Sequence, residues 1–517
     1  MYSGCYVLES LGLHYPLGRR AKRRRCEPWA RVKIAERYDG IVVGAGVAGL
    51  TAAARMAQAG MHVLVLEQHN VPGGCASFYQ RDGYRFDVGA TLVGGFGPRG
   101  VHTKLFSELG VDCIARRLDP AMVVHLGAQR IIRYGDGRWP AERASVFGTG
   151  AEPFWNEQER LATLAWDFSS RMPALPADLS GLRAFAGAFR PAHLQLLPAI
   201  GRTVASIMPP GHPLLRLFVD VQLLITAQCD ARSADLTYGA TALDLAREGT
   251  FHLDGGVAAI SLALARAVRR LGASIAYGIA ATRVIDEGGR ARGLELTGGT
   301  RVRAPRIVLA LPVQNSVGLS RELREAYAPK LAALPQRWGA FMAYVGLPPG
   351  VVPDDAALHH QVVLDPGRPL GEGNSVFVSL SAPADSGRAR NGGRAVTLST
   401  HTDVALWERA VAAGEDGPLR EAYARRLLDA LDRALPGSSR TATLVEPATP
   451  GTFRRYTGRT RGLVGGLPQV PALTTLGAFS HHTPVRGLFL CGDTTFPGQS
   501  TVGATLSGTA AGRAAAS

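Results

Sequence analysis

Three glycines and one acid carry the clearest chemical signal in the sequence. Gly44, Gly46 and Gly49 form a G-x-G-x-x-G turn, and Glu67 follows about 20 residues further on. In such a turn the first glycine permits a tight bend, the second lets backbone approach a pyrophosphate, and the third lets a helix pack on a strand. An acid at that distance can accept hydrogen bonds from ribose hydroxyls. The four residues together predict a dinucleotide site.

The surrounding residues predict the elements that would position this turn. Residues 38–43 form a short apolar run rich in β-branched side chains, which is typical of a buried parallel strand. Residues 50–59 predict an alanine-rich helix that ends at Gly60, and residues 61–66 predict a second strand just before Glu67. The start of the helix directs free N–H groups and a positive dipole end toward phosphate.

A second acid lies in a similar setting near the carboxyl end of the chain. Residues 487–493 predict a buried strand that ends in Gly492 and Asp493, and an alanine-rich helix begins at about Gly503 after a loop. An acid at the end of a strand and before a helix can bind a polyol hydroxyl and the edge of an electron-rich ring. The alternative is that Asp493 only caps the helix.

Composition favours a globular protein of two or more domains without a membrane-spanning helix. A chain of 517 residues is too long for one compact core. The most apolar long segment, 214–227, is interrupted by Arg216 and Asp220 and predicts a buried or interfacial helix. The formal net charge is +15, of which residues 1–37 contribute +6 through nine basic and three acidic residues. The remaining +9 weakly favours contact with an anionic membrane surface.

Residues 1–35 predict a disordered amino-terminal extension or an over-called translation start, although the basic cluster 19–25 could instead bind phospholipid or nucleic acid.

The six cysteines are scattered without a C-x-x-C pair, which argues against a disulfide framework or a zinc site. Free thiols indicate a reducing, cytoplasmic setting.

The sequence predicts no metal site and assigns no catalytic base, because no Ser-His-Asp or metal-ligand constellation is visible. Asp87 is a candidate acid or base, and the alternative is a structural role beside the nucleotide site. The pairs His359-His360 and His481-His482 are predicted on strands, where neighbouring side chains point to opposite faces, and are expected at the surface or in the core.

The order of these signals predicts an α/β fold with two discontinuous domains. A Rossmann-type domain, a parallel sheet with helices, comprises residues 36–105, 250–315 and 482–517. An α+β substrate domain comprises residues 106–249 and 316–481 and has a helical, partly membrane-facing part.

The layout resembles the FAD-dependent carotenoid desaturase and isomerase family (phytoene desaturase-like), within the broader amine-oxidase-like flavoproteins. Residues 42–74, 86–91 and 487–508 carry the resemblance. Within the family, residues 87–109 and 455–469 look most like the bacterial desaturases that act at C-3,4 of hydroxylated carotenoids.

The resemblance implies that FAD lies across the Rossmann-type domain. Glu67 would bind the adenosine ribose, the backbone of Val284 the adenine, and Asp493 the ribityl chain. Residues 46–48 would bind the pyrophosphate, and residues 501–502 the isoalloxazine edge. The full implied set is Gly44, Ala45, Gly46, Val47, Ala48, Gly49, Glu67, Gln68, Gly73, Gly74, Gly89, Thr91, Val284, Gly492, Asp493, Thr501 and Val502.

One position departs from the family pattern. Many amine-oxidase-like flavoproteins have a basic residue after the double glycine, where this chain has Cys75. The pyrophosphate is therefore expected to rely more on backbone N–H groups there, and Cys75 is expected to fill a turn rather than to attach to flavin.

The resemblance implies desaturation of a linear, hydroxylated carotenoid at C-3,4. Flavin can accept the hydride, so the protein need only position the polyene in a long apolar tunnel and exclude water. Residues 150–250 are candidates for the lining of that tunnel. Alternatives within the family are a phytoene desaturase, a carotenoid isomerase and a carotenoid ketolase. An amine oxidase and a non-enzymatic lipid-binding chaperone of the same fold are more distant alternatives.

A carotenoid is too insoluble to reach the flavin through water, so the protein is expected in the cytoplasm, peripherally bound to membrane lipid at the inner face of the cell membrane. No second G-x-G-x-x-G turn follows a strand, which argues against a reductase that draws electrons from NAD(P)H. A quinone or oxygen is the expected electron acceptor, and no nucleic-acid partner is expected.

Overall fold

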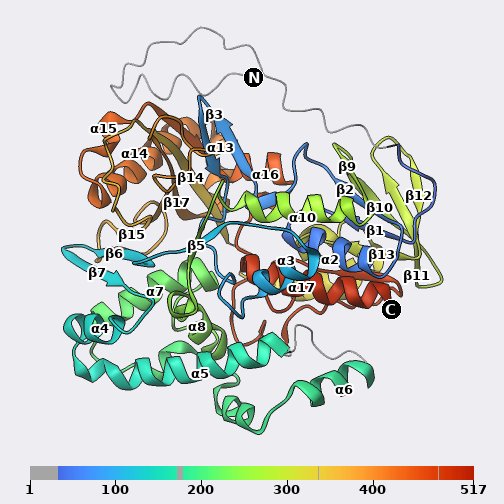
Figure 1. The fold of residues 1–517 in the computed structure, drawn as a ribbon, viewed down its shortest axis with the longest axis horizontal. Coiled ribbons are helices and arrows are strands. Elements are labelled where there is room, and N and C mark those ends of the chain that lie inside the picture. The colour runs from blue at the N-terminus through green and yellow to red at the C-terminus, as the bar shows by residue number, and fades with distance from the viewer. Residues whose placement is uncertain (1–32, 172–178, 336, 475–476) are drawn as a thin grey trace.

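The computed structural model describes residues 33–171, 179–335, 337–474 and 477–517 (Figure 1). Nearly all of the predicted amino-terminal extension, residues 1–35, lies outside these ranges. Within them, no helix combines the length and the apolar character needed to cross a bilayer.

A parallel sheet of five strands brings the two nucleotide motifs together. Its order is β19–β13–β1–β2–β9, and each strand pairs in parallel with its neighbour. The strands are β1 (Gly40–Val43), β2 (Val63–Glu67), β9 (Ser274–Tyr277), β13 (Arg306–Leu309) and β19 (Leu488–Leu490). Helices and a second sheet cover both faces, which explains why these strands are almost continuously apolar. The predicted α/β class with a Rossmann-type sheet is confirmed.

Three helices from distant parts of the chain pack on one face of this sheet, as Figure 1 shows. They are α2 (Val47–Gln58), α10 (Ala258–Arg270) and α17 (Ser500–Ala516). A Cβ atom at Gly508 of α17 would lie 2.2 Å from the carbonyl oxygen of Ala48 on α2. Glycine at this position therefore allows the last helix of the chain to lie directly against the first nucleotide motif.

The opposite face is covered by a smaller antiparallel sheet and one helix. These elements are β10 (Ala281–Glu287), β11 (Arg290–Leu296), β12 (Arg301–Arg303) and α12 (Arg321–Ala332). Ile41 and Leu64 of the parallel sheet point to this side and pack with Leu294 of β11 and Leu323 of α12.

A second large sheet of seven strands has the order β18–β14–β17–β16–β15–β6–β7. Its strands are β6 (Met122–Leu126), β7 (Gln129–Arg133), β14 (Trp338–Leu347), β15 (His359–Val363), β16 (Ser375–Leu380), β17 (Arg394–Asp403) and β18 (Leu444–Ala448). Only the β15–β6 pair is parallel among these strands. Helices α13 (Val404–Ala413) and α14 (Asp416–Ala434) share a hydrophobic core with the sheet.

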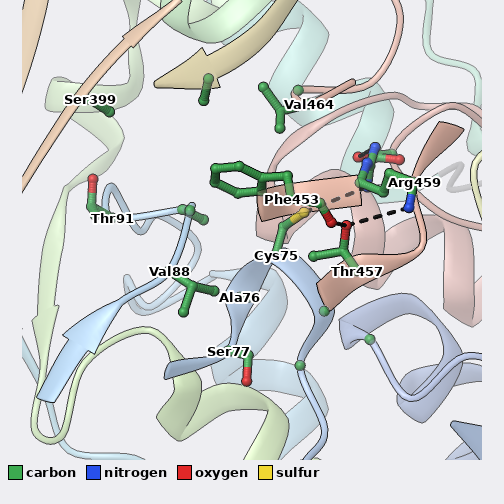
Figure 2. A pocket seen from close by; sticks show the side chains of 18 of the residues that line it. Cys75, Ala76, Ser77, Val88, Thr91, Ser399, Phe453, Thr457, Arg459 and Val464 are labelled. Carbon is green, nitrogen blue, oxygen red and sulfur yellow. Dashed lines mark hydrogen bonds and ion pairs between the residues drawn. The ribbon is translucent and has the colours of Figure 1, made fainter. Parts of the chain in front are cut away.

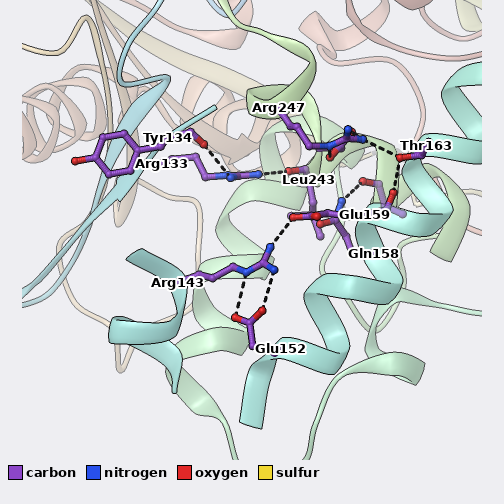
Figure 3. A network of polar contacts seen from close by, with 11 residues as sticks. Arg133, Tyr134, Arg143, Glu152, Gln158, Glu159, Thr163, Leu243 and Arg247 are labelled. Atoms are coloured by element: carbon purple, nitrogen blue, oxygen red, sulfur yellow. Dashed lines mark hydrogen bonds and ion pairs between the residues drawn. The ribbon is translucent and has the colours of Figure 1, made fainter. Parts of the chain in front are cut away.

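A helical layer lies beside the β6–β7 edge of this sheet (Figure 1). Its helices are α4 (Trp139–Phe147), α5 (Glu152–Arg171), α7 (Pro213–Ala227) and α8 (Leu236–Leu243). Arg143 of α4 ion-pairs with Glu152 and Glu159 of α5 (Figure 3). The side chain of Arg143 is only 4% exposed. Arg133 of β7 donates to the carbonyl oxygen of Leu243 on α8 at 2.9 Å. These contacts position the helices against one another and against the sheet.

Two helix boundaries differ from the predicted ones. Helix α2 begins at Val47 rather than Leu50, because Gly46 is extended (φ −73°, ψ 175°) and the helix follows it directly. Helix α17 begins at Ser500 rather than Gly503. Both helices therefore start closer to the glycine turns than the alanine content alone predicts.

The strand prediction for His481 and His482 is wrong. These residues lie outside the strands of the large sheets, and their ring centroids are only 4.2 Å apart rather than on opposite faces. His359 and His360 do lie on a strand, β15, and both are buried. Their core location is one of the two that the sequence predicts.

Candidate active site

A cavity of about 1830 Å³ extends from the carboxyl edge of the parallel sheet to the seven-stranded sheet. Most of the predicted cofactor residues line it, namely Gly44, Gly46, Val47, Ala48, Glu67, Gln68, Gly73, Gly74, Gly89, Thr91, Gly492, Asp493, Thr501 and Val502. Its volume exceeds the roughly 300–1,000 Å³ of a typical small-molecule pocket, so it can hold a dinucleotide and a second ligand.

Three predicted cofactor residues do not line the cavity: Ala45, Gly49 and Val284. The backbone N–H of Val284 donates to the carbonyl oxygen of Leu319 at 2.8 Å, so it is already paired. Residues 279–281, just before Val284, line the cavity in its place. The N–H of Val284 is therefore already used within the protein, and its expected contact with the adenine stays a prediction.

The three glycines of the turn have different surroundings. Gly44 has a φ of +102°, which favours glycine. A Cβ atom at Gly49 would lie 2.0 Å from the carbonyl oxygen of Gly44, so helix α2 packs too closely for a side chain there. A Cβ atom at Gly46 would meet no protein atom within 4 Å. Gly46 thus faces open space in the cavity at the N-terminus of α2, where a phosphate would meet backbone N–H groups.

Glu67 is held at the end of β2 by two backbone hydrogen bonds. Its Oε2 accepts from the N–H of Ala45 and its Oε1 from the N–H of His69, each at 2.8 Å. Burial raises the pKa of the Glu67 carboxyl, and the backbone hydrogen bonds oppose that rise. Each oxygen keeps a further lone pair, so the carboxylate can also accept from ligand hydroxyls in the cavity. Ala45 therefore does not line the cavity itself, but its N–H holds the carboxylate of Glu67, which does.

Arg459 is a site residue that the sequence does not identify. It follows α16 (Pro450–Thr457), and its Nη2 donates to Oδ2 of Asp493 at 2.6 Å. Its Nη1 donates to the sulfur of Cys75 at 3.7 Å. Figure 2 shows the two side chains facing one another in the cavity wall. Arg459 therefore places a guanidinium beside the position where many amine-oxidase-like flavoproteins carry a basic side chain. The greater reliance of the pyrophosphate on backbone N–H groups at this position stays a prediction, and Arg459 is a further candidate there.

Cys75 itself is a half-buried thiol. Burial raises its pKa, and the opposing effect of Arg459 is smaller. The residue lies in a short 3₁₀ turn, Gly74–Ala76, that lines the cavity. A raised pKa disfavours the reactive thiolate, which agrees with the expectation that Cys75 fills a turn.

Asp87 does not line the cavity and has a structural environment. It is 2% exposed, ion-pairs with Arg388 at 2.9 Å, and accepts from the N–H of Val257 at the start of α10 at 2.8 Å. Burial raises the pKa of its carboxyl, and Arg388 opposes that rise. Of the two roles considered from the sequence, the geometry favours the structural one.

Apolar side chains line the part of the cavity that lies away from the glycine turns. Helix α7 contributes Val221, Leu224 and Ile225, in agreement with the expectation that the region 150–250 supplies lining. The seven-stranded sheet contributes Met342 and Phe377. This part of the cavity suits a long apolar ligand.

Two glutamines in the cavity wall each have one oxygen without a hydrogen-bond partner among the described residues. Gln228 donates through Nε2 to the carbonyl oxygen of Leu224 at 3.5 Å and to Nε2 of His401 at 3.0 Å. Gln499 donates to the next carbonyl oxygen, that of Ile225, at 3.2 Å. Both Oε1 atoms are buried and lack a donor, and both residues line the cavity. Buried acceptors are normally paired, so these oxygens are candidates for a ligand donor.

Comparisons with known proteins agree with this geometry. Residues 42–109 match the model of an NAD(P)-binding Rossmann-like domain. The chain is 28% identical to the chloroplastic prolycopene isomerase of Arabidopsis thaliana, over 91% of this chain and 81% of that one. It is 25% identical to the neurosporene-forming phytoene desaturase of Cereibacter sphaeroides, over 89% of this chain and 90% of that one.

Among solved structures, wild-type putrescine oxidase bound to putrescine superposes with a TM-score of 0.61. The match covers 93% of this chain and 98% of that chain at 18% sequence identity. At that identity the likeness concerns the fold.

Proposed function

Because this chain belongs to the carotenoid desaturase and isomerase family, we propose that it is an FAD-dependent oxidoreductase that desaturates a linear, hydroxylated carotenoid. The observation that carries the proposal is the shared cavity, in which a dinucleotide site opens directly into an apolar chamber. Such a cavity suits a polyene whose reacting bond must lie against a flavin.

The residues of the glycine turns fit FAD. Gly46 and Gly74 leave open space where a pyrophosphate would lie, since a Cβ atom at either would meet no protein atom within 4 Å. Glu67 would accept from the ribose hydroxyls, and Asp493 from the ribityl chain. Arg459 would add positive charge near the pyrophosphate or the flavin ring. FAD so bound would accept the hydride that leaves the substrate. We also propose the two domains expected from the sequence. The FAD-binding domain comprises residues 36–105, 250–315 and 482–517, and the substrate domain comprises residues 106–249 and 316–481.

The protein's own contribution is to position the polyene and exclude water. Desaturation removes a hydride and a proton from neighbouring carbons, and the apolar wall from α7 and β14 would hold those carbons in place. We assign no catalytic base.

The two free glutamine oxygens support a substrate that carries a hydroxyl group. Gln228 and Gln499 donate to the carbonyl oxygens of Leu224 and Ile225 on α7, and both residues line the cavity. Both residues are near the Gly492-Asp493 motif, because the turn at Gly465 and Gly466 packs against Gln228, Gln499 and the backbone of Asp493. A hydroxyl bound there would bring a nearby carbon–carbon bond toward the flavin, as desaturation at C-3,4 of a hydroxylated end requires.

Isomerisation is the second candidate, favoured by the relatedness to prolycopene isomerases over most of the chain. The discriminating experiment expresses the chain in a host that makes defined linear carotenoids with and without a terminal hydroxyl. Desaturation lowers the product mass by two hydrogens and shifts absorption to the red, whereas isomerisation leaves the mass unchanged. A purified protein without bound flavin would contradict both enzymatic candidates and favour a lipid-binding protein.

A quinone or oxygen is the proposed acceptor of the electrons, and the inner face of the cell membrane is the proposed location. The apolar chamber supports this location, since a carotenoid that fills it would have to arrive from a bilayer.

A further inference from the structure

A row of three large apolar side chains is exposed on the helical layer. Leu194, Leu197 and Ile200 are 52%, 54% and 56% exposed. They lie at and just beyond the 3₁₀ helix Pro191–Ala199, with a spacing of three residues. Because a 3₁₀ helix has three residues per turn, this spacing favours a common edge for the three side chains. We refer to Leu194, Leu197 and Ile200 as the apolar row.

The opposite side of the same 3₁₀ helix is fixed to α5. Leu196 and Ala199 pack with Leu161 and Ala162 of α5. His193 is buried, and its Nε2 lies 3.0 Å from Oδ2 of Asp167 on α5. Because this side of the 3₁₀ helix is packed against α5, the apolar row on its other side faces solvent.

The surface around the row is basic. Residues 179–212 contain Arg183, Arg190 and Arg202 and no aspartate or glutamate. The three arginines are exposed, and one of them, Arg190, ion-pairs with Asp167 of α5 at 3.5 Å. Exposed leucine and isoleucine side chains flanked by arginine are the combination by which a protein surface binds an anionic bilayer.

The apolar row is also adjacent to the cavity. Trp166 of α5 packs with Leu196 in the cluster beneath the row and lines the cavity as well. Ser169, one turn further along α5, lines the cavity too. Figure 1 shows α5 and α6 (Leu179–Ala188) along one outer edge of the molecule, away from the parallel sheet. An apolar ligand released from a bilayer at this edge would have a short path to the cavity.

We propose that the apolar row and its flanking arginines are the surface by which the protein binds an anionic lipid bilayer, with α5 leading from that bilayer to the cavity. The proposal rests on the proposed function only for the identity of the lipid-soluble substrate. The lipid-binding surface itself is defined by Leu194, Leu197, Ile200, Arg190 and Arg202.

The test is flotation of the full chain with phosphatidylcholine vesicles that contain or lack phosphatidylglycerol. The triple variant L194S/L197S/I200S should lose about tenfold or more in partitioning, because three apolar side chains no longer enter the bilayer. The matched control is I114S/V411S, since Ile114 and Val411 are exposed to 60% and 63% in other parts of the chain. The control should float as the unmodified protein does.

The arginines are tested separately with R190Q/R202Q. This variant should bind anionic vesicles several-fold more weakly, bind neutral vesicles as before, and differ from the unmodified protein less at high salt, where charges are screened within about 3 Å at 1 M. Flavin content and unfolding temperature serve as folding controls for both variants.

Equal binding by the triple variant and the unmodified protein would overturn the proposal, as would an equal loss in the control. If the apolar row instead joins two copies of the chain, the triple variant would have a smaller particle mass and unchanged flotation. That result would also overturn the proposal. Flotation uses lipid alone, so a protein that floats through this row yet leaves carotenoids unaltered would contradict the proposed function and not the bilayer surface.

Discussion

At the residue scale, Gly46 separates cofactor binding from folding. Gly46→Val should fold, because its Cβ atom would meet no protein atom within 4 Å and its φ of −73° suits any residue. The valine side chain would occupy the space of the pyrophosphate and remove charged hydrogen bonds that contribute about 1.5–3 kcal/mol each. We expect FAD affinity to fall about a hundredfold or more, as measured by flavin content and calorimetric titration.

Gly49→Val provides the contrast within the same turn. Its Cβ atom would lie 2.0 Å from the carbonyl oxygen of Gly44, so this variant should lose soluble expression or unfolding temperature as well as flavin. A well-folded Gly46→Val protein that binds FAD with normal affinity would show that the pyrophosphate lies elsewhere.

Arg459 leads to a second residue-scale prediction. Arg459→Met should weaken FAD binding by about tenfold to a hundredfold and alter the flavin's reduction potential, because it removes the guanidinium beside Cys75 and Asp493. Arg459→Lys should restore part of the loss. The control is Arg461→Met, which removes a more exposed arginine that pairs with Glu408. Equal flavin affinity and potential in the Arg459 and Arg461 variants would exclude a cofactor role for Arg459.

At the scale of elements, Arg143 connects α4 to α5. Arg143→Met should destabilise the protein by about 1–3 kcal/mol, since the buried guanidinium loses both glutamate partners while those glutamates remain partly hydrated. Urea unfolding measures the loss, and amide hydrogen exchange should show faster opening of α4 and α5. The control is Arg321→Met, which removes an exposed arginine that pairs with Glu325 and should leave stability unchanged. Unaltered exchange in α4 and α5 would mean that Arg143 does not hold these helices together.

The elements around the nucleotide motifs could be predicted from the sequence, because their signals are local. Strand β2 and helix α2 follow from apolar runs, alanine content and glycine turns within a stretch of a few dozen residues. The contact of Arg459 with Cys75 could not be predicted, because it joins residues far apart in the chain through the packing of α16. The role of Gln499 in the cavity wall could not be predicted for the same reason, since its hydrogen-bond partner Ile225 lies on α7.

At the scale of the whole molecule, the two large sheets meet around the shared cavity. Residues from both of them and from the helical layer line it, so the site depends on the complete chain rather than on the Rossmann-type part. The N–H of Val284 is paired with the carbonyl oxygen of Leu319, and the cavity is lined by residues 279–281 of the same segment.

Buried histidines make the stability of the whole molecule sensitive to acid. Burial lowers the pKa of His102 to about 4, so the folded protein leaves this ring neutral while the unfolded chain protonates it below about pH 6.5. Stability from His102 is therefore present above pH 6.5 and lost as the pH falls toward 4, by about 3 kcal/mol in total. Buried acids with raised pKa, such as Asp87, act in the opposite direction.

A comparison of the unmodified protein with His102→Asn isolates this contribution. Between pH 7 and pH 4 the variant should lose less free energy of unfolding than the unmodified protein, by about the same 3 kcal/mol. Parallel pH profiles for the two proteins would show that His102 is protonated in the folded state as readily as in the unfolded chain.

The most direct test of the proposed desaturation is a single turnover without an electron acceptor. Purified protein with oxidised FAD is mixed, free of oxygen, with a linear hydroxylated carotenoid in liposomes. Desaturation predicts a product lighter by two hydrogens and absorbing further to the red, with loss of the oxidised flavin spectrum in equal amount and its return on adding a quinone or oxygen. Products of unchanged mass with the flavin still oxidised would contradict desaturation.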